Sequence, residues 1–97
     1  MRFLISQKEQ LQEIIDHYGA DHQKDKLFEE MAELQKEVCK EKDCKGDIQH
    51  IAEELADVNI MLQQIQLIYG ITDEQIEVKE KIERTLDRIE GECNESK

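Results

Sequence analysis

Two closely spaced groups of acidic residues could together create a metal-binding site. The first is the segment EEMAE, which contains Glu29, Glu30 and Glu33, and the second is EELAD, which contains Glu54 and Asp57. Residues three apart on a helix project on the same side, so each group presents a pair of carboxylates. If the two helices pack antiparallel, four carboxylates converge, and they cannot all remain charged without a counter-charge. We therefore expect a bound cation.

The position of Glu54 strengthens this expectation. Placed on a helix, the residues from Asp47 to Tyr69 form a wide apolar arc, and Glu54 falls inside it between Val58 and Met61. Asp57 lies at the edge of the arc. An ionised carboxylate on a buried stripe is costly unless it is paired or coordinates a metal. This segment is the helix around which we expect the chain to be organised.

The oxygen-only ligand set favours a hard cation, so we expect Mg²⁺, with Mn²⁺ as a substitute. A ferritin-like di-iron site would need Glu-x-x-His pairs, which this sequence lacks. His50 precedes Glu54 by one turn, and we interpret it as a surface or edge histidine and not as a ligand. The alternative is that the acids only solvate helix surfaces, because Asp and Glu account for 24 of the 97 residues.

The spacing of the three cysteines indicates reduced thiols and not a metal site. A zinc site formed by Cys39, Cys44 and His50 is conceivable, but its spacing matches no common zinc motif. Cys93 has no neighbouring cysteine in the sequence. We expect ordinary cytosolic thiols for all three.

Length and composition favour a single helical domain. The 97-residue chain contains no proline and few aromatic residues, which is typical of a helical bundle. Its formal net charge of -11 argues against binding of a nucleic acid polymer, which depends on clustered Lys and Arg. No apolar run approaches the ~20 residues of a membrane span, and residues 1–10 are too soon polar for a secretory signal. We expect a cytoplasmic protein without membrane contact.

Apolar periodicity predicts an all-α, four-helix bundle-like fold. The predicted helices span residues 7–18, 24–42, 47–69 and 73–90. Capping-box patterns precede the first and the fourth, at Ser6 with Glu9 and at Thr72 with Gln75. Asp47 is suited to cap the third helix, and Gly70 to close it in the left-handed conformation. We expect one domain over residues 1–91 and a disordered tail over 92–97 after Gly91.

The third predicted helix is apolar on more than one side, because Ile60 and Leu67 lie away from its main arc. Such a helix must contact neighbours on several faces. A chain of this length buries only a modest core, so one neighbour could belong to a second subunit.

The pattern of acids resembles the MazG-like family of all-α nucleoside triphosphate pyrophosphohydrolases, whose motif is EExxE, a spacer, and then ExxD. In this sequence the motif is met by Glu29, Glu30 and Glu33, followed by Glu54 and Asp57. The resemblance runs from about Leu27 to Arg88 and includes a following helix with the pattern KxxR.

This resemblance implies a reaction and a set of site residues. The family cleaves nucleoside triphosphates between the α- and β-phosphates, giving a monophosphate and pyrophosphate, often to remove non-standard nucleotides. The implied magnesium ligands are Glu30, Glu33, Glu54 and Asp57, with Glu29 and Glu53 as supporting acids. The implied catalytic base is Glu33 or Glu30. Assembly as a homodimer or a dimer of dimers is also implied.

The resemblance further implies that Lys81, Arg84 and Arg88, which share a polar face, contact the substrate phosphates. The alternative is a solvated helix face on which Glu77 pairs with Lys81 and Glu80 pairs with Arg84. Many relatives carry an asparagine where this chain has Thr85. Two other functions stay open: a non-catalytic acidic helical interaction module, and a family member that has lost efficient catalysis.

Overall fold

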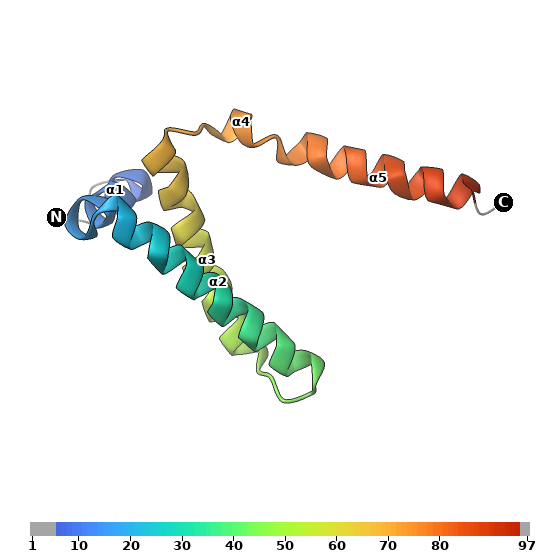
Figure 1. The fold of residues 1–97 in the computed structure, drawn as a ribbon, viewed down its shortest axis with the longest axis horizontal. Helices are drawn as coiled ribbons and strands as arrows, with labels where there is room; N and C mark the ends of the chain where they lie inside the picture. The colour runs from blue at the N-terminus through green and yellow to red at the C-terminus, as the bar shows by residue number, and fades with distance from the viewer. Residues whose placement is uncertain (1–5, 96–97) are drawn as a thin grey trace.

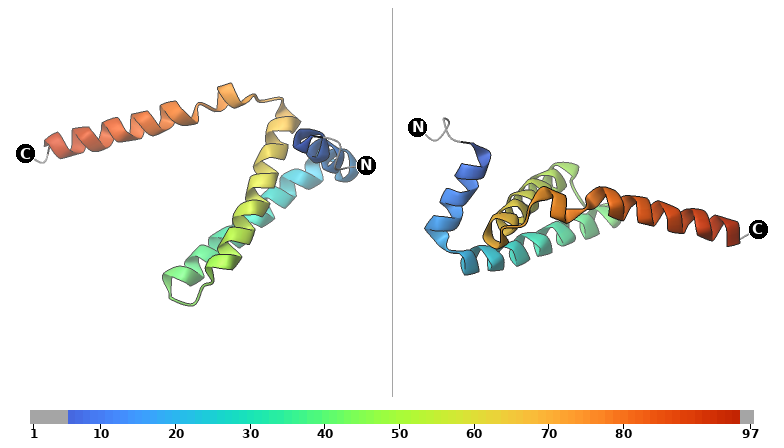
Figure 2. Two further views of the ribbon diagram at one scale, coloured as in Figure 1. Left: turned by 180° about the vertical axis from the view of Figure 1, so that it is seen from behind. Right: turned by 90° about the horizontal axis from the view of Figure 1, so that it is seen from above.

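The computed structural model describes residues 6–95, and these residues form helices without any strand. Helices α1 (Gln7–Tyr18), α2 (Ala20–Lys42) and α3 (Ile48–Tyr69) pack together, and α2 and α3 form a long hairpin (Figure 1). The single turn α4 (Asp73–Ile76) and helix α5 (Val78–Glu95) lead away from this group, as Figure 2 shows from two further directions. The predicted all-α fold is confirmed.

The predicted helix caps are formed. The Ser6 hydroxyl accepts a hydrogen bond from the Glu9 amide at 3.1 Å, and the Asp47 carboxylate accepts one from the Gln49 amide at 2.8 Å. Gly70 closes α3 with a φ of 64°, a left-handed conformation that glycine adopts without steric cost. Thr72 and Gln75 form both hydrogen bonds of a capping box at the start of α4.

The second helix, predicted over residues 24–42, begins four residues earlier, at Ala20. Gly19 alone turns the chain, with a φ of 93° that a residue with a side chain rarely adopts. The Gln23 amide then donates to the Gly19 carbonyl at 3.1 Å, so the polar residues after Gly19 are already helical.

The fourth predicted helix is interrupted at Glu77, which ends α4 in the left-handed region with a φ of 52°. The spacing of apolar residues does not reveal one left-handed residue, because the same helical spacing continues after Glu77. Helix α5 then continues through Gly91 to Glu95, five residues beyond the predicted end of the fourth helix at residue 90 and into the tail expected over 92–97. Residues 96–97 lie outside the described part of the chain.

The core lies where α1, α2 and α3 meet and is small. Its buried apolar residues are Leu11, Ile15, Val58 and Met61. The apolar residues of α2 are only partly covered, because Phe28 is 63% exposed and Met31 is 49% exposed. Leu55 and Leu62, which the apolar arc of the third helix included, are also about half exposed. Much of the apolar surface of the α2–α3 hairpin therefore remains open.

Candidate metal centre

Three of the predicted ligands meet on the α2–α3 hairpin. Glu30 on α2 and Glu54 and Asp57 on α3 each offer a carboxylate oxygen, and these oxygens all lie within 4.8 Å of one another. The antiparallel packing of the two helices and the three-residue spacing of Glu54 and Asp57 produce this arrangement. Within the part of the chain that the structure describes, this is the one group of three or more metal-ligating side chains.

Glu54 is the anomalous member of the group. Its Oε2 atom is buried and has no hydrogen-bond partner among the described residues. Removal from water raises the pKa of Glu54, and the neighbouring carboxylates of Glu30, Asp57 and Glu33 raise it further. A buried acceptor without a partner, next to like charges, is destabilising, and a cation would relieve both effects.

The other predicted acids lie around this group. Glu33 is exposed and close enough to Glu54 for its charge to affect the pKa of Glu54. Glu29 is exposed and forms an ion pair with Lys26 at 3.3 Å, as Lys26 does with Glu30 at 3.4 Å. Sequence reasoning missed Lys26, although its spacing of four residues before Glu30 was a usable signal. Glu53 is exposed on α3.

His50 lies near two acids outside the carboxylate group. Its Nδ1 atom lies 3.9 Å from the Glu37 carboxylate of α2, and its Nε2 atom lies 3.9 Å from the carboxylate of Asp47. It does not join the carboxylate group formed by Glu30, Glu54 and Asp57. Cys39 and Cys44 are free and exposed, and neither belongs to a metal-ligating group with His50 in the described chain.

The three predicted phosphate-binding residues lie on α5, away from the carboxylates. Helix α5 projects away from the hairpin that carries Glu30 and Glu54 (Figure 1). Among the described residues, Lys81, Arg84 and Arg88 form no ion pair, and the alternative pairs with Glu77 and Glu80 are not made. A single chain therefore does not bring the basic and acidic parts of the predicted site together.

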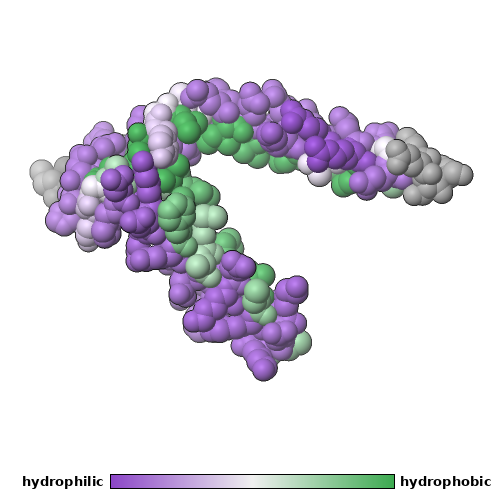
Figure 3. Space-filling model, in the orientation of Figure 1, coloured by the Kyte–Doolittle hydropathy of each residue, from purple (hydrophilic) through white to green (hydrophobic). Residues whose placement is uncertain are grey.

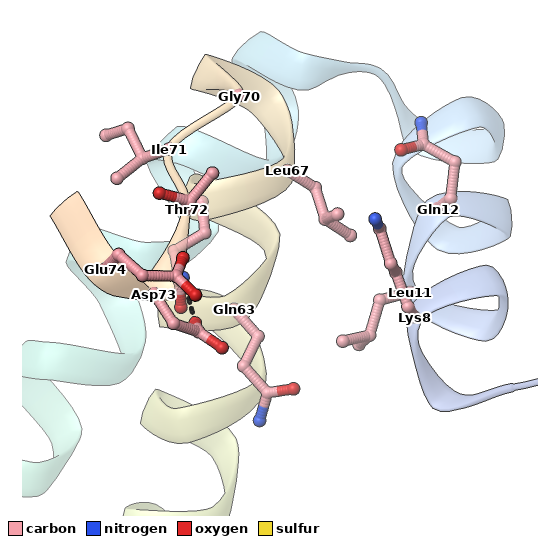
Figure 4. Close-up of a pocket in the computed structure, with 11 residues that line it drawn as sticks. Lys8, Leu11, Gln12, Gln63, Leu67, Gly70, Ile71, Thr72, Asp73 and Glu74 are labelled. Carbon is pink, nitrogen blue, oxygen red and sulfur yellow. Dashed lines mark hydrogen bonds between the residues drawn. The ribbon is translucent and has the colours of Figure 1, made fainter. Parts of the chain in front are cut away.

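A separate cavity of about 790 Å³ lies between α1, the end of α3 and the start of α4. Figure 4 shows Lys8 and Leu11 projecting from α1 toward Leu67, with Asp73 and Glu74 on the other side. None of the predicted site residues lines this cavity. It is a feature of the α1–α3 packing and lies apart from the carboxylate group.

The donor set fits a hard divalent cation. Oxygens on opposite sides of Mg²⁺ are about 4.2 Å apart, given ligand distances near 2.1 Å, which lies within the spread of the three carboxylates.

Comparison of the chain with protein-family models, with curated proteins and with solved structures found no match. None of the described helices combines the length and apolar character needed to cross a bilayer. The chain is thus defined by its fold and site as an all-α protein with a carboxylate cluster.

Proposed function

We propose that this protein is a Mg²⁺-dependent nucleoside triphosphate pyrophosphohydrolase. The observation that carries the proposal is the buried, unpartnered Oε2 of Glu54 beside Glu30 and Asp57. The resemblance of the EEMAE and EELAD segments to the MazG-like motif supplies the reaction class. Three of the acids that the motif would use, Glu30, Glu54 and Asp57, lie together in the structure, which supports the proposal.

In this proposal Glu30, Glu33, Glu54 and Asp57 hold the metal. When bound, Mg²⁺ supplies positive charge to the triphosphate and acidifies water. The protein itself is strongly acidic, with a formal net charge of -11, so an anionic substrate needs such a counter-charge. Lys26 holds the outer side of Glu30 and Glu29 in place through its two ion pairs.

Of the two candidates for the base, Glu33 is the better. Glu30 is held in an ion pair by Lys26 at 3.4 Å, whereas Glu33 is exposed and has no ion pair among the described residues, so its carboxylate is open to a water molecule. In the proposed step a water oxygen bonds to the α-phosphorus and its proton passes to the Glu33 carboxylate. The bond from the α-phosphorus to the bridging oxygen breaks, and pyrophosphate leaves with the electron pair.

The test is pyrophosphate release from a panel of canonical and modified nucleoside triphosphates, including dUTP, dCTP and oxidised purine triphosphates. The natural chain is compared with Glu54→Gln, in the presence and absence of Mg²⁺ or Mn²⁺. Asp25→Asn is the matched control, because it removes one exposed charge from α2 without touching the carboxylate group. We expect metal-dependent release by the natural chain and the control, and at least a hundredfold loss in Glu54→Gln, in line with the transition-state charge that is lost.

Equal pyrophosphate release with and without the metal, and by the natural chain and Glu54→Gln, would overturn the proposed site. A folded natural chain that releases none from any triphosphate would overturn the proposed reaction. The acidic interaction module would then be the better interpretation, and Glu54→Gln would fold and behave like the natural chain.

A further inference from the structure

A lysine lies at the edge of the carboxylate group. The Lys26 ammonium is 3.4 Å from a carboxylate oxygen of Glu30 and 3.3 Å from one of Glu29. Among the ion pairs of the described residues, the pair between Lys26 and Glu30 is the one that includes a member of the group. Glu30 therefore divides its charge between Lys26 and the site that it forms with Glu54 and Asp57.

Helical spacing directs Lys26 toward this site. Glu30 follows Lys26 by four residues and Glu33 follows Glu30 by three, so the three side chains share one face of α2. That face is turned toward α3, because Gln23, one turn before Lys26, donates a hydrogen bond to Gln64 of α3. Lys26 thus lies between a buried contact of the hairpin and the carboxylates.

The ion pair with Glu30 is less screened than an ordinary surface pair. The Glu30 side chain is 15% exposed, whereas the Glu29 side chain is 66% exposed and that of Lys26 is 45% exposed. A charge that has lost most of its water interacts more strongly with a nearby opposite charge, because less solvent screens the pair. Glu30 is therefore the stronger partner of Lys26, and the half-exposed lysine still has room to move.

Helix α5 supplies no positive charge to these acids within one chain. Figure 3 shows an open angle between α5 and the α2–α3 hairpin, so the hairpin itself must provide a counter-charge. The need is real, because the buried Oε2 of Glu54 has no hydrogen-bond partner and lies beside other carboxylates. In the metal-free chain, Lys26 meets part of this need through Glu30.

We propose that Lys26 is the exchangeable counter-ion of the carboxylate group. In the metal-free chain its ammonium neutralises Glu30. Glu30 gives up this pair when it binds a divalent cation, because two positive groups beside one carboxylate repel each other. Glu29 keeps Lys26 at the edge of the site, where the ammonium then pairs with the phosphates of the substrate. The inference rests on the proposed function for the metal and for the triphosphate.

Loss of the Lys26 charge should therefore change two affinities in opposite directions. A bare divalent cation should bind more tightly, because no ammonium competes for Glu30. A triphosphate should bind the metal-loaded chain more weakly, because one of its cationic partners is missing. A lysine that only holds the Glu30 side chain in position would produce neither pattern: its removal would weaken the binding of the metal as well.

The first measurement uses the metal alone. The electron paramagnetic resonance signal of free Mn²⁺ reports its binding at about 0.15 M ionic strength, where distant charges are screened. We expect Lys26→Met, which keeps the apolar stem, to bind Mn²⁺ about tenfold more tightly than the natural chain, and Lys26→Arg to stay within about threefold. Lys24→Met is the matched control, because Lys24 pairs with Asp21 and not with the carboxylate group, and it should change the affinity less than about twofold. Equal or weaker binding by Lys26→Met would overturn the proposal.

The second measurement uses the chain saturated with Mg²⁺. Calorimetric titrations use the α,β-methylene analogues of dATP, dCTP and dUTP, which carry the triphosphate charge and cannot be cleaved between the α- and β-phosphates. We expect Lys26→Met to bind these analogues about tenfold more weakly than the natural chain, and Lys26→Arg and Lys24→Met to stay within about threefold. Equal affinities of the natural chain and Lys26→Met would show that Lys26 does not pair with the phosphates and would overturn the exchange.

The two measurements separate this inference from the proposed function. Both expected shifts in Lys26→Met, with no pyrophosphate release by the natural chain, would overturn the reaction and support the exchangeable counter-ion. Metal-dependent pyrophosphate release by the natural chain, with both affinities unchanged in Lys26→Met, would support the reaction and overturn the counter-ion. A natural chain that binds no Mn²⁺ would overturn the metal site and this inference together.

Discussion

The Nε2 atom of Gln23 donates a hydrogen bond to the Oε1 atom of Gln64 at 2.8 Å, and both side chains are buried. The pair links the start of α2 to the last third of α3 across 41 residues of sequence. Gln64 also lies 3.6 Å from the sulfur of Met61, so it is surrounded by the apolar core. The Gln64 oxygen satisfies the Gln23 Nε2 group where water is excluded, while the Gln23 oxygen pairs with Nδ1 of His22 at 2.8 Å, so the loss of Gln64 leaves a buried donor without a partner.

We predict that Gln64→Leu lowers the free energy of unfolding by about 1–3 kcal/mol, because it leaves the buried Gln23 amide without its partner. Gln23→Leu/Gln64→Leu should lose less than the sum of the two single changes, since no polar group is then left unsatisfied. Urea unfolding at a fixed protein concentration measures this. Gln12→Leu, which breaks an exposed hydrogen bond to Asp16, is the control and should change little. Additive single changes would contradict the coupling.

The raised pKa of Glu54 predicts a pH dependence of the metal-free protein. The folded chain keeps the Glu54 proton at pH values where the unfolded chain, with an ordinary value near 4.5, has lost it. The folded state then binds more protons, so the free energy of unfolding falls as pH rises above 4.5. Glu54→Gln should therefore raise the melting temperature in EDTA more at pH 7 than at about pH 4.5.

With Mg²⁺ added at pH 7, the natural chain should melt at a higher temperature than Glu54→Gln. The cation stabilises the natural carboxylate and not the amide that replaces it. Thermal melts with and without Mg²⁺ at pH 7 check this. An equal effect of Glu54→Gln at both pH values, or equal Mg²⁺ stabilisation of both chains, would speak against the carboxylate group as a cation site.

The helix break at Glu77 predicts which of two variants, Glu77→Gly or Glu77→Ala, is the more stable. At a left-handed residue, Glu77→Gly should be more stable than Glu77→Ala by about 1 kcal/mol, because only the alanine side chain clashes with its own backbone. In one continuous helix over residues 73–90 the order would be reversed by a similar amount, about 1 kcal/mol, because glycine is the poorer helix former. The free energies of unfolding of the two variants decide between these structures.

The turn between α2 and α3 predicts a steric effect at Gly46. A Cβ atom added there would lie 2.5 Å from the backbone nitrogen of Glu41 and 2.6 Å from its Cα. Gly46→Ala should therefore destabilise the hairpin by roughly 1–3 kcal/mol. Gly91→Ala is the matched control, because Gly91 lies in open space within α5 and alanine should stabilise it by about 0.5–1 kcal/mol. Equal effects would mean that the turn has another geometry.

The sequence by itself determined the all-α fold, most helix boundaries and the candidate acids. Caps such as Asp47 and the Gly70 closure depend on residues within one turn, so local patterns report them reliably. The three-residue spacing of Glu54 and Asp57 fixes their common side of α3 in the same way. The predicted end of the first helix at residue 18 is also local, whereas the direct connection through Gly19 to α2 was not predicted.

Only the tertiary structure decided which of these groups meet. The buried Gln23–Gln64 pair and the meeting of Glu30 with Glu54 depend on how α2 and α3 pack, and periodicity along either helix carries no such information. The break at Glu77 comes from a single left-handed residue that leaves the apolar pattern intact. That residue and the fixed end of α3 separate the cations of α5 from the acids within one chain, because backbone direction, and not composition, sets where a helix goes.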